Sequence, residues 1–331
     1  MKSKFNFVGI LLLGLVMLLA ACGGSATESG GSSSGGDGSD YPKRNIEVLV
    51  GHGAGGGTDM FARQVTKQLE EILDVNINVV NQEGGAGVVA AQNAFNAPAD
   101  GYTLIADAAF PITTAAGTNT HGLNDFTPIA RFQADTYALW VSKDKYKSID
   151  EFLKAAKEKS GEITVGGTGS LGMDEMTVFM LGQAAEVDFN FVPMEGSGEM
   201  HAGVLGGHLE AMVDEFGPTK SLYDDGSIVP LVVFAEERLE EFPDVPTTVE
   251  LGWELTDGNE RGFYIKNGTD PEIIKALEEA MNKVYESEEY QKYEEESYLH
   301  LREGWLNSED FTNRTDELIE KYKVIMKELQ Q

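Results

Sequence analysis

The chain has 331 residues and a formal net charge of −30, from 55 acidic and 25 basic side chains. So acidic a surface disfavours nucleic acid and bare anionic membrane as partners. Cys22 is the only cysteine, so no disulfide can form within the chain, and none of the five histidines has the spacing of a metal site. We therefore expect a fold held by its own apolar core, with no metal and no cofactor.

The N-terminus has the three parts of a secretory signal peptide. Lys2 and Lys4 precede an apolar run over 10–20, which is too short to span a membrane and ends in small residues. The Leu-Ala-Ala-Cys ending at Cys22 resembles the bacterial lipobox, in which the cysteine becomes the lipid-modified first residue of the mature protein. We predict a signal peptide over 1–21 and a lipid anchor that holds the protein outside the cytoplasm. The alternative is an ordinary signal peptide followed by a buried cysteine.

Residues 22–40 are nearly all Gly, Ser, Ala, Thr, Asp and Glu after the cysteine. Such a segment cannot bury enough apolar surface to offset the entropy of ordering, so we expect a flexible tether. The folded part begins near Tyr41, and its roughly 290 residues suit one two-lobed unit or two domains.

The first part of the folded region alternates strand and helix patterns. Strands are predicted over 46–50, 75–81 and 102–106, and helices over 60–73 and 86–97. This β-α-β-α-β order indicates a parallel sheet with helices on both faces.

A second alternation follows, and its first helix opens with a capping-box pattern at Ser148 and Glu151. Strands are predicted over 137–142, 163–166, 189–193, 209–214 and 228–234, and helices over 148–159, 173–185 and 199–205. Two further helices are predicted to begin at Asp270-Pro271 and at about Ser308.

A glycine-rich loop, residues 51–59, follows the first strand and opens the first helix. Backbone N–H groups at a helix start bind anions well when glycine removes side-chain bulk. The spacing of Gly51, Gly53 and Gly56 matches a dinucleotide fingerprint, but no acidic residue ends the second strand. The alternatives are a carboxylate-binding loop and a tight turn, which needs only one or two glycines. A phosphate loop of the Walker type is excluded because no Gly-Lys-Ser/Thr follows.

Two more glycine loops, over 166–172 and 195–198, lie between strands and helices of the second alternation. Ligands of open α/β sheets bind beyond the carboxyl ends of the strands. We therefore expect two lobes that each present such loops and close on a small ligand from both sides.

An ordered series of motifs from Tyr41 to the C-terminus resembles the substrate-binding proteins of tripartite tricarboxylate transporters, also called Bug receptors. The motifs are Tyr41-Pro42-x-Arg44-x-Ile46, Gly55-Gly56-Gly57-Thr58-Asp59, Gly84-x-Ala86-Gly87, Asp100-Gly101-Tyr102-Thr103-Leu104, Gly196-Ser197, Leu205-Gly206-Gly207 and Asp244-Val245-Pro246-Thr247. One such motif alone is weak evidence for the family, whereas the whole series in this order is specific for it.

The resemblance implies an α/β fold of the two-lobed periplasmic-binding-protein type II class. Each lobe would be a mostly parallel sheet flanked by helices, with the ligand cleft between the lobes. Lobe one would comprise 41–135 and 236–331, and lobe two 136–235. The resemblance also implies a monomeric receptor, not an enzyme, that delivers a small organic carboxylate to the large and small membrane subunits of a transporter.

In such receptors backbone amides and waters hold most of the ligand carboxylate, which explains how so acidic a protein can bind an anion. By position, the resemblance assigns ligand contacts to both lobes. In lobe one these are His52, Ala54, Gly55, Gly56, Thr58, Asp59, Asp107 and Ala108; in lobe two they are Thr168, Gly169, Ser170, Gly196, Ser197 and Asp214.

Two acidic residues, Glu83 and Glu195, depart from the family pattern. If either lines the cleft, a tricarboxylate is disfavoured. A monocarboxylate is then favoured, or a zwitterion whose ammonium meets Asp59 or Asp107. The alternative is that both glutamates point to solvent.

Two other functions stay open. The receptor could report its ligand to a membrane two-component sensor instead of a transporter. A secreted hydrolase is the more distant alternative, because the sequence has no Gly-x-Ser-x-Gly elbow and no identifiable nucleophile beside His52, its one candidate acid or base.

Overall fold

The computed structural model describes residues 41–170, 172–194, 196–256 and 258–329. The predicted signal peptide, the tether with Cys22, and Glu195 lie outside these residues. Within them, no helix has the length and apolar character needed to cross a membrane.

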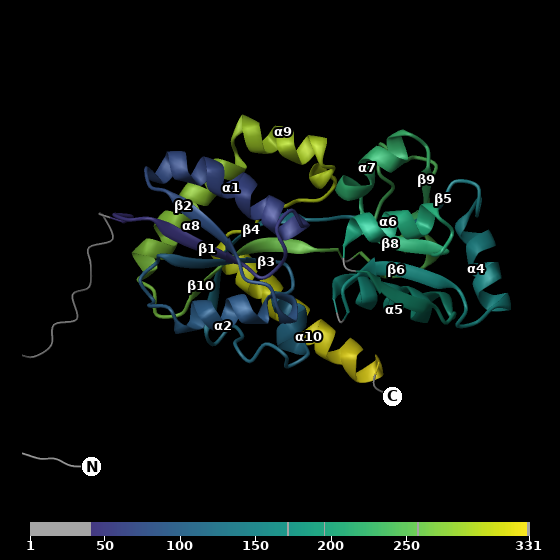
Figure 1. Cartoon of the computed structure of the whole chain (residues 1–331), viewed down its shortest axis with the longest axis horizontal. Coiled ribbons are helices and arrows are strands. Elements are labelled where there is room, and N and C mark those ends of the chain that lie inside the picture. The colour runs from purple at the N-terminus through teal and green to yellow at the C-terminus, as the bar shows by residue number, and fades with distance from the viewer. Residues whose placement is uncertain (1–40, 171, 195, 257, 330–331) are drawn as a thin grey trace, which may run out of the picture. The chain divides into compact units, whose positions relative to one another are not determined.

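Two five-stranded sheets flanked by helices organise the described chain (Figure 1), which confirms the predicted α/β class. The half that carries the first sheet is called lobe one, and the half that carries the second sheet is called lobe two. The first sheet has the order β2-β1-β3-β10-β4, with β1 Ile46–Val50, β2 Ile77–Asn81, β3 Thr103–Asp107, β4 Phe126–Ala134 and β10 Glu260–Lys266. The second has the order β7-β6-β8-β5-β9, with β5 Tyr137–Ser142, β6 Thr164–Thr168, β7 Asn190–Met194, β8 Ala211–Glu215 and β9 Ile228–Val233.

In each sheet one of the described strands runs against its neighbours. Strand β10 is antiparallel to both β3 and β4, and β5 is antiparallel to both β8 and β9. The other pairings are parallel. Helices that follow β5 or β10 therefore start at the opposite edge of the sheet from helices that follow the parallel strands.

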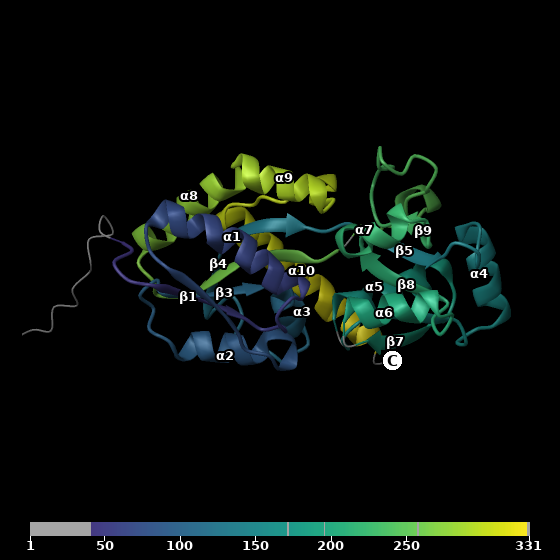
Figure 2. The same cartoon turned by 45° about the horizontal axis from the view of Figure 1, so that its top comes forward.

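Helices cover both faces of the first sheet, and α1 and α2 lie on opposite sides of it (Figure 2). The helices of lobe one are α1 Gly57–Leu73, α2 Val88–Asn96, α3 Phe110–Ala115, α8 Pro271–Tyr285, α9 Glu288–Glu296 and α10 Ser308–Leu329. The helices of lobe two are α4 Ile149–Glu158, α5 Met173–Ala185, α6 Ser197–Leu205 and α7 Phe216–Asp224.

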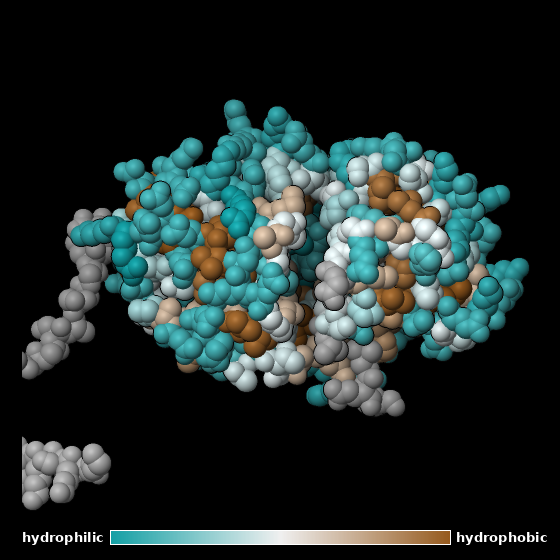
Figure 3. Space-filling view, viewed as in Figure 1, coloured by the Kyte–Doolittle hydropathy of each residue, from teal (hydrophilic) through white to brown (hydrophobic). Residues whose placement is uncertain are grey.

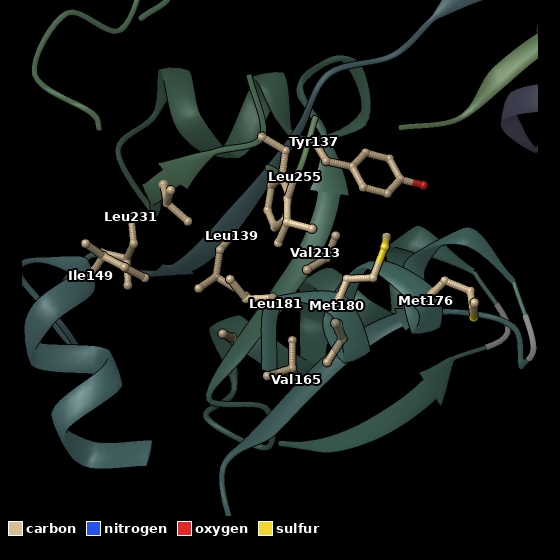
Figure 4. Packing of buried hydrophobic residues seen from close by; sticks show 14 of the residues in the cluster. Tyr137, Leu139, Ile149, Val165, Met176, Met180, Leu181, Val213, Leu231 and Leu255 are labelled. Atoms are coloured by element: carbon tan, nitrogen blue, oxygen red, sulfur yellow. The ribbon is translucent and has the colours of Figure 1, made fainter. Parts of the chain in front are cut away.

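Alternation along the strands divides each core into two layers, because successive strand residues face opposite sides of a sheet. Val48 and Val50 pack with α1 and α8, whereas Leu49 between them packs with α2. In β5, Leu139 lies in the cluster shared with α4 and α5 (Figure 4), and Trp140 packs with α6. These buried side chains are the apolar core that a chain without a disulfide was expected to need.

The last helix does not stay with lobe one along its whole length. Phe311, in its first turn, packs in the core of the first sheet. Leu318, Tyr322 and Ile325 belong to the core cluster of lobe two, and the Tyr322 hydroxyl lies 3.1 Å from the Met173 sulfur. Helix α10 thus joins the two lobes.

The strands and helices that were not predicted from the sequence include β4, β10, α3 and α7. The first sheet is consequently mixed, with β10 between β3 and β4.

The segment after β9 also lies elsewhere than expected. Leu239, Phe242 and Val245 pack in the core of lobe two, and the backbone of Val233 bonds with Pro246 and Thr248. The expected boundary at 236 had assigned this segment to lobe one. We propose that lobe two extends to Leu255, which packs in the other core cluster of that lobe.

Arg261, in β10, joins the two lobes where the chain crosses between the sheets. Its buried guanidinium forms ion pairs with Asp135, between β4 and β5, and with Glu215, the last residue of β8. The Nη2–Oε1 distance to Glu215 is 2.9 Å, and Asn259 donates to the same oxygen at 2.6 Å. One guanidinium therefore holds two buried carboxylates from different parts of the chain.

Replacing Arg261 with Met should cost about 3–5 kcal/mol of unfolding free energy at pH 8, because both carboxylates would stay buried without their cation. Burial raises the pKa of Asp135 to about 8 even with Arg261 present. A carboxyl group whose pKa is raised by folding contributes stability at pH values below its unfolded pKa and loses it as the pH rises. Without Arg261 that pKa rises further, so the loss measured by urea unfolding should be smallest at pH 5 and grow as the pH rises through 8.

The matched control is Arg44→Met, which removes an exposed ion pair with Asp100 at 2.8 Å. It should cost less than about 1 kcal/mol at either pH. Equal losses for the two variants would contradict a buried electrostatic role for Arg261.

The first residue of α1 packs against the same guanidinium. A Cβ atom on Gly57 would lie 2.7 Å from Arg261 Nη2, and the two carboxylates hold that group in place. Gly57→Ala should therefore destabilise the fold by about 1–3 kcal/mol in urea unfolding. Gly198→Ala is the control, because a Cβ atom there meets nothing within 4 Å in the first turn of α6. The stability of Gly198→Ala should be unchanged or slightly higher. A loss as large as that of Gly57→Ala would contradict a steric clash at Gly57.

Candidate functional site

The predicted ligand contacts lie at the carboxyl ends of parallel strands in both sheets. In lobe one they follow β1 and β3, and in lobe two they follow β6 and β7 or end β8. Arg261 lies between two of these ends, because it packs against Gly57 at the start of α1 and pairs with Glu215 at the end of β8. The carboxyl edges of the two sheets therefore meet around this arginine. Figure 3 shows a groove between lobe one, on the left, and lobe two.

The helices that begin at these strand ends share one feature in the described chain, which is the lack of a side-chain cap. They are α1, α2, α3, α5, α6 and α7. Helices α4, α8 and α9 start elsewhere and are capped by the side chains of Ser148, Asp270 and Ser287. Whether one of these helices has a side-chain cap therefore depends on the sheet edge at which it starts.

Four of the uncapped helices have glycine as the N-cap residue, namely Gly56 for α1, Gly87 for α2, Gly172 for α5 and Gly196 for α6. The first-turn amides of a helix have no partner within the helix. Together with the positive end of the helix dipole, such amides attract an anion. The starts of α1, α5 and α6, which adjoin loops with predicted ligand contacts, are thus suited to binding a carboxylate.

The loop after β1 is shaped by the carboxylate of Asp59, which is buried. It accepts hydrogen bonds from the Gly55 amide at 2.9 Å, from Arg63 Nε at 3.0 Å and from Asn81 Nδ2 at 2.8 Å. Burial raises the pKa of Asp59, but these hydrogen bonds outweigh burial and hold the pKa below its usual value. Asp59 and the Gly55 amide therefore hold the loop in shape, and their contact with a ligand stays a prediction.

Asp107 plays a similar part at the end of β3. Its carboxylate accepts from the amides of Ala108 at 2.8 Å and Ala109 at 3.0 Å. The Nδ1 atom of His52 lies 3.9 Å from it, buried and without a hydrogen bond in the described structure. Burial raises the pKa of Asp107, and His52 offsets part of that rise. The structure thus brings together His52 and Asp107, as well as Asp107 and Ala108.

In lobe two, the loop after β6 is tied to the start of α5. Asp174 accepts from the amide and hydroxyl of Thr168 at 2.7 and 2.8 Å, and from the Tyr137 hydroxyl at 2.5 Å. The Gly169 amide donates to the Met194 carbonyl at 2.9 Å, which joins this loop to the end of β7. Ser170 continues the same loop. The loops after β6 and β7, predicted separately, therefore lie side by side.

Asp214 lies one residue before the end of β8, facing α6. It accepts from His201 Nε2 at 2.7 Å and from the Glu215 amide at 2.9 Å. Burial raises the pKa of Asp214 to about 6, and the bond from His201 offsets part of that rise. Ser197, another predicted contact, opens α6 one turn before His201.

Sequence reasoning missed three residues that shape this region, which are Asp174, His201 and Arg261. Asp174 has a local signal, because it follows the glycine loop in the first helical turn. His201 lies four residues after Ser197, one turn along the same helix face. Arg261 had no signal, because its strand was not predicted.

Glu83 lies beside the first glycine loop. The residue is exposed, and its Oε1 atom is 3.3 Å from the position that a Cβ atom on Gly53 would occupy. Its negative charge is therefore next to the loop that the sequence assigns to the ligand.

The chain is similar to known proteins over most of its length. The model of the tripartite tricarboxylate transporter family receptor, TctC, matches residues 61–330. A UPF0065 protein of Cupriavidus necator is 30% identical over 298 residues, which cover 87% of this chain and 88% of that protein.

Solved structures show the same fold. A TctC solute binding protein from Polaromonas, without ligand, is 28% identical with a TM-score of 0.72, over 87% of this chain and 99% of that one. MatC from Rhodopseudomonas palustris, solved with bound malate, has a TM-score of 0.74 at 24% identity, over 86% of this chain and 99% of that one. The predicted periplasmic-binding-protein fold is thereby confirmed. This chain belongs to the tripartite tricarboxylate transporter receptor family, as its ordered series of motifs predicted.

Proposed function

We propose that the protein is a monomeric extracytoplasmic receptor that binds a small organic carboxylate between its lobes, without converting it, and delivers it to the membrane subunits of a tripartite tricarboxylate-type transporter. The observation that carries this proposal is the set of uncapped helix starts at the carboxyl edges of both sheets. The malate in MatC, which shares the fold, supports a carboxylate as the ligand.

In this proposal the first turn of α1 provides amides from lobe one, and the first turn of α6 provides them from lobe two. Thr58 and Ser197 lie in these turns, and the loop from Thr168 to Ser170 adds its backbone beside α6. A carboxylate that contacts both lobes stabilises the closed arrangement, because it binds better there than to one lobe alone.

The charges around the groove favour a ligand with few carboxylates. Arg63 is paired with Asp59, and Arg261 is paired with Asp135 and Glu215. Amides can hold one carboxylate group, but each further ionised group would lie near buried acids and near Glu83. We therefore infer that a mono- or dicarboxylate binds better than a tricarboxylate.

Binding should be measured by thermal shift and calorimetry with acetate, malate, adipate and citrate. At least one of the first three should raise the melting temperature and bind more tightly than citrate. Tight citrate binding would refute the inferred ligand class but not the receptor. If no carboxylate in an extended panel binds, the receptor function itself is contradicted.

A carboxylate built into the protein should compete with the ligand. Gly196 has an extended backbone, and a Cβ atom on it meets nothing within 4 Å. In Gly196→Asp the new side chain would cap α6 and occupy its first-turn amides. We expect at least a tenfold loss of affinity for the best carboxylate of the panel, with the melting temperature unchanged or raised.

The control for this variant is Ser148→Asp, which places the same acid on the N-cap of α4 at the other edge of the second sheet. Its affinity should match that of the wild type. If Gly196→Asp also binds like the wild type, α6 does not hold the carboxylate.

We also propose that Cys22 carries the lipid that keeps the receptor near its transporter. A tether of this kind raises the effective concentration of the receptor at the membrane, so a weak docking surface is sufficient. Cys22→Ser should bind its carboxylate unchanged, should not incorporate labelled palmitate, and should fail to support uptake in cells. Uptake at the normal rate would show that the anchor is dispensable for transport.

A further inference from the structure

Four buried carboxylates meet where the chain crosses between the lobes. Asp135 lies on the crossing itself, Asp174 in the first turn of α5, and Asp214 and Glu215 at the end of β8. The charge of Glu215 acts on each of the other three. We call these four residues the crossing cluster.

Within the part of the chain that the structure describes, fewer cations than carboxylates face this cluster. From β10, Arg261 pairs with Asp135 and Glu215, and from the loop after α9, Arg302 donates to the Asp135 carbonyl at 3.1 Å. From α6, His201 bonds Asp214 at 2.7 Å.

Two tyrosines complete the surroundings. The Tyr137 hydroxyl, from β5, donates to Asp174, and the Tyr293 hydroxyl, from α9, lies within the electrostatic reach of Asp135 and Glu215. Among the described residues, two arginines thus face four carboxylates, and His201 and bound protons can supply further compensation.

The acid–base properties of the cluster agree with this count. Burial raises the pKa of Asp174, that of Asp214 to about 6 and that of Asp135 to about 8. Some members therefore exchange protons with solvent near neutral pH.

The cluster is in direct contact with the predicted ligand loops. The amide and hydroxyl of Thr168 both bond Asp174, and Asp214 is itself a predicted contact. Through Arg261 the cluster also reaches Gly57 in the first turn of α1. An anion bound at either helix start would lie close to these carboxylates.

We propose that capture of a carboxylate in the groove is coupled to uptake of a proton from solvent by the crossing cluster, so that the receptor binds more tightly as the pH falls from 8 to 6.5. An incoming negative charge makes ionised neighbours less favourable and draws a proton onto them. By linkage, a site that takes up protons on binding must bind more tightly at lower pH. The inference rests on the proposed function, because it needs an anion in the groove.

Calorimetry of the wild-type protein tests the coupling. Whichever of acetate, malate, adipate and citrate binds best is titrated at pH 7 in phosphate and in Tris, which differ in ionisation enthalpy. We expect uptake of about 0.3–1 proton for each carboxylate bound, and an affinity that rises about two- to tenfold for each unit of falling pH between 8 and 6.5. Tight binding with no proton uptake and no pH dependence would overturn the inference and leave the receptor function standing. Failure of all four probes would count against the receptor function instead.

Variants locate the proton. Asp214→Asn removes one titrating group without changing its size, and His201→Gln removes the partner of that group. At least one of them should reduce proton uptake by half or more, whatever happens to the affinity. His121→Gln is the control, because its pair with Asp125, at 3.2 Å, lies where His121 stacks on Phe95 of α2. Full proton uptake in both variants would show that neither Asp214 nor His201 takes up the proton and would contradict this assignment.

Discussion

The direction of two strands determines which helix starts meet where the two sheets face each other. Strands β5 and β10 run against their neighbours, and each enters its sheet directly after the chain has crossed between the lobes. Helices α4 and α8, which follow them, therefore start at the outer edges and are capped by Ser148 and Asp270. The edges that meet are left to helices without side-chain caps. The strand directions thus separate helix starts that are capped by a side chain from helix starts whose first amides remain available to an anion.

Charge alone would not suggest an anion receptor, because the chain carries a net −30. In the structure, Arg63 and Arg261 form ion pairs with acidic side chains of the protein itself. Arg63 holds Asp59, which in turn holds the Gly55 amide, and Arg261 holds Asp135 and Glu215. In the proposed receptor, attraction for a carboxylate is then short-ranged and comes from backbone dipoles at fixed positions. In this proposal such a site holds one carboxylate group by its geometry, and the acids around it disfavour each further ionised group of the ligand.

Local signals in the sequence predicted much of this fold. The helix over 173–185 and the cap at Ser148 match the structure, because both depend on neighbouring residues. Strand β10 was missed, since it opens with Glu260 and Arg261 and carries no simple alternation of apolar residues. The partners of Arg261 lie 46 and 126 positions away in the chain. No local pattern can indicate such pairs, so the glycine loops were predictable from the sequence and the crossing cluster was not.

The crossing cluster joins the two lobes through buried charges, and burying them costs desolvation free energy. Well-packed apolar side chains of similar volume would join them at least as stably as buried ions, whose desolvation offsets most of their attraction. What apolar side chains cannot do is change their energy when a charge arrives nearby. Asp174 is bonded to the loop at Thr168, and Glu215 is linked through Arg261 to the start of α1. A carboxylate that binds either loop therefore acts on the same buried charges that connect the lobes. In the proposed receptor, this shared electrostatic network couples occupancy of the groove to the protonation of the crossing.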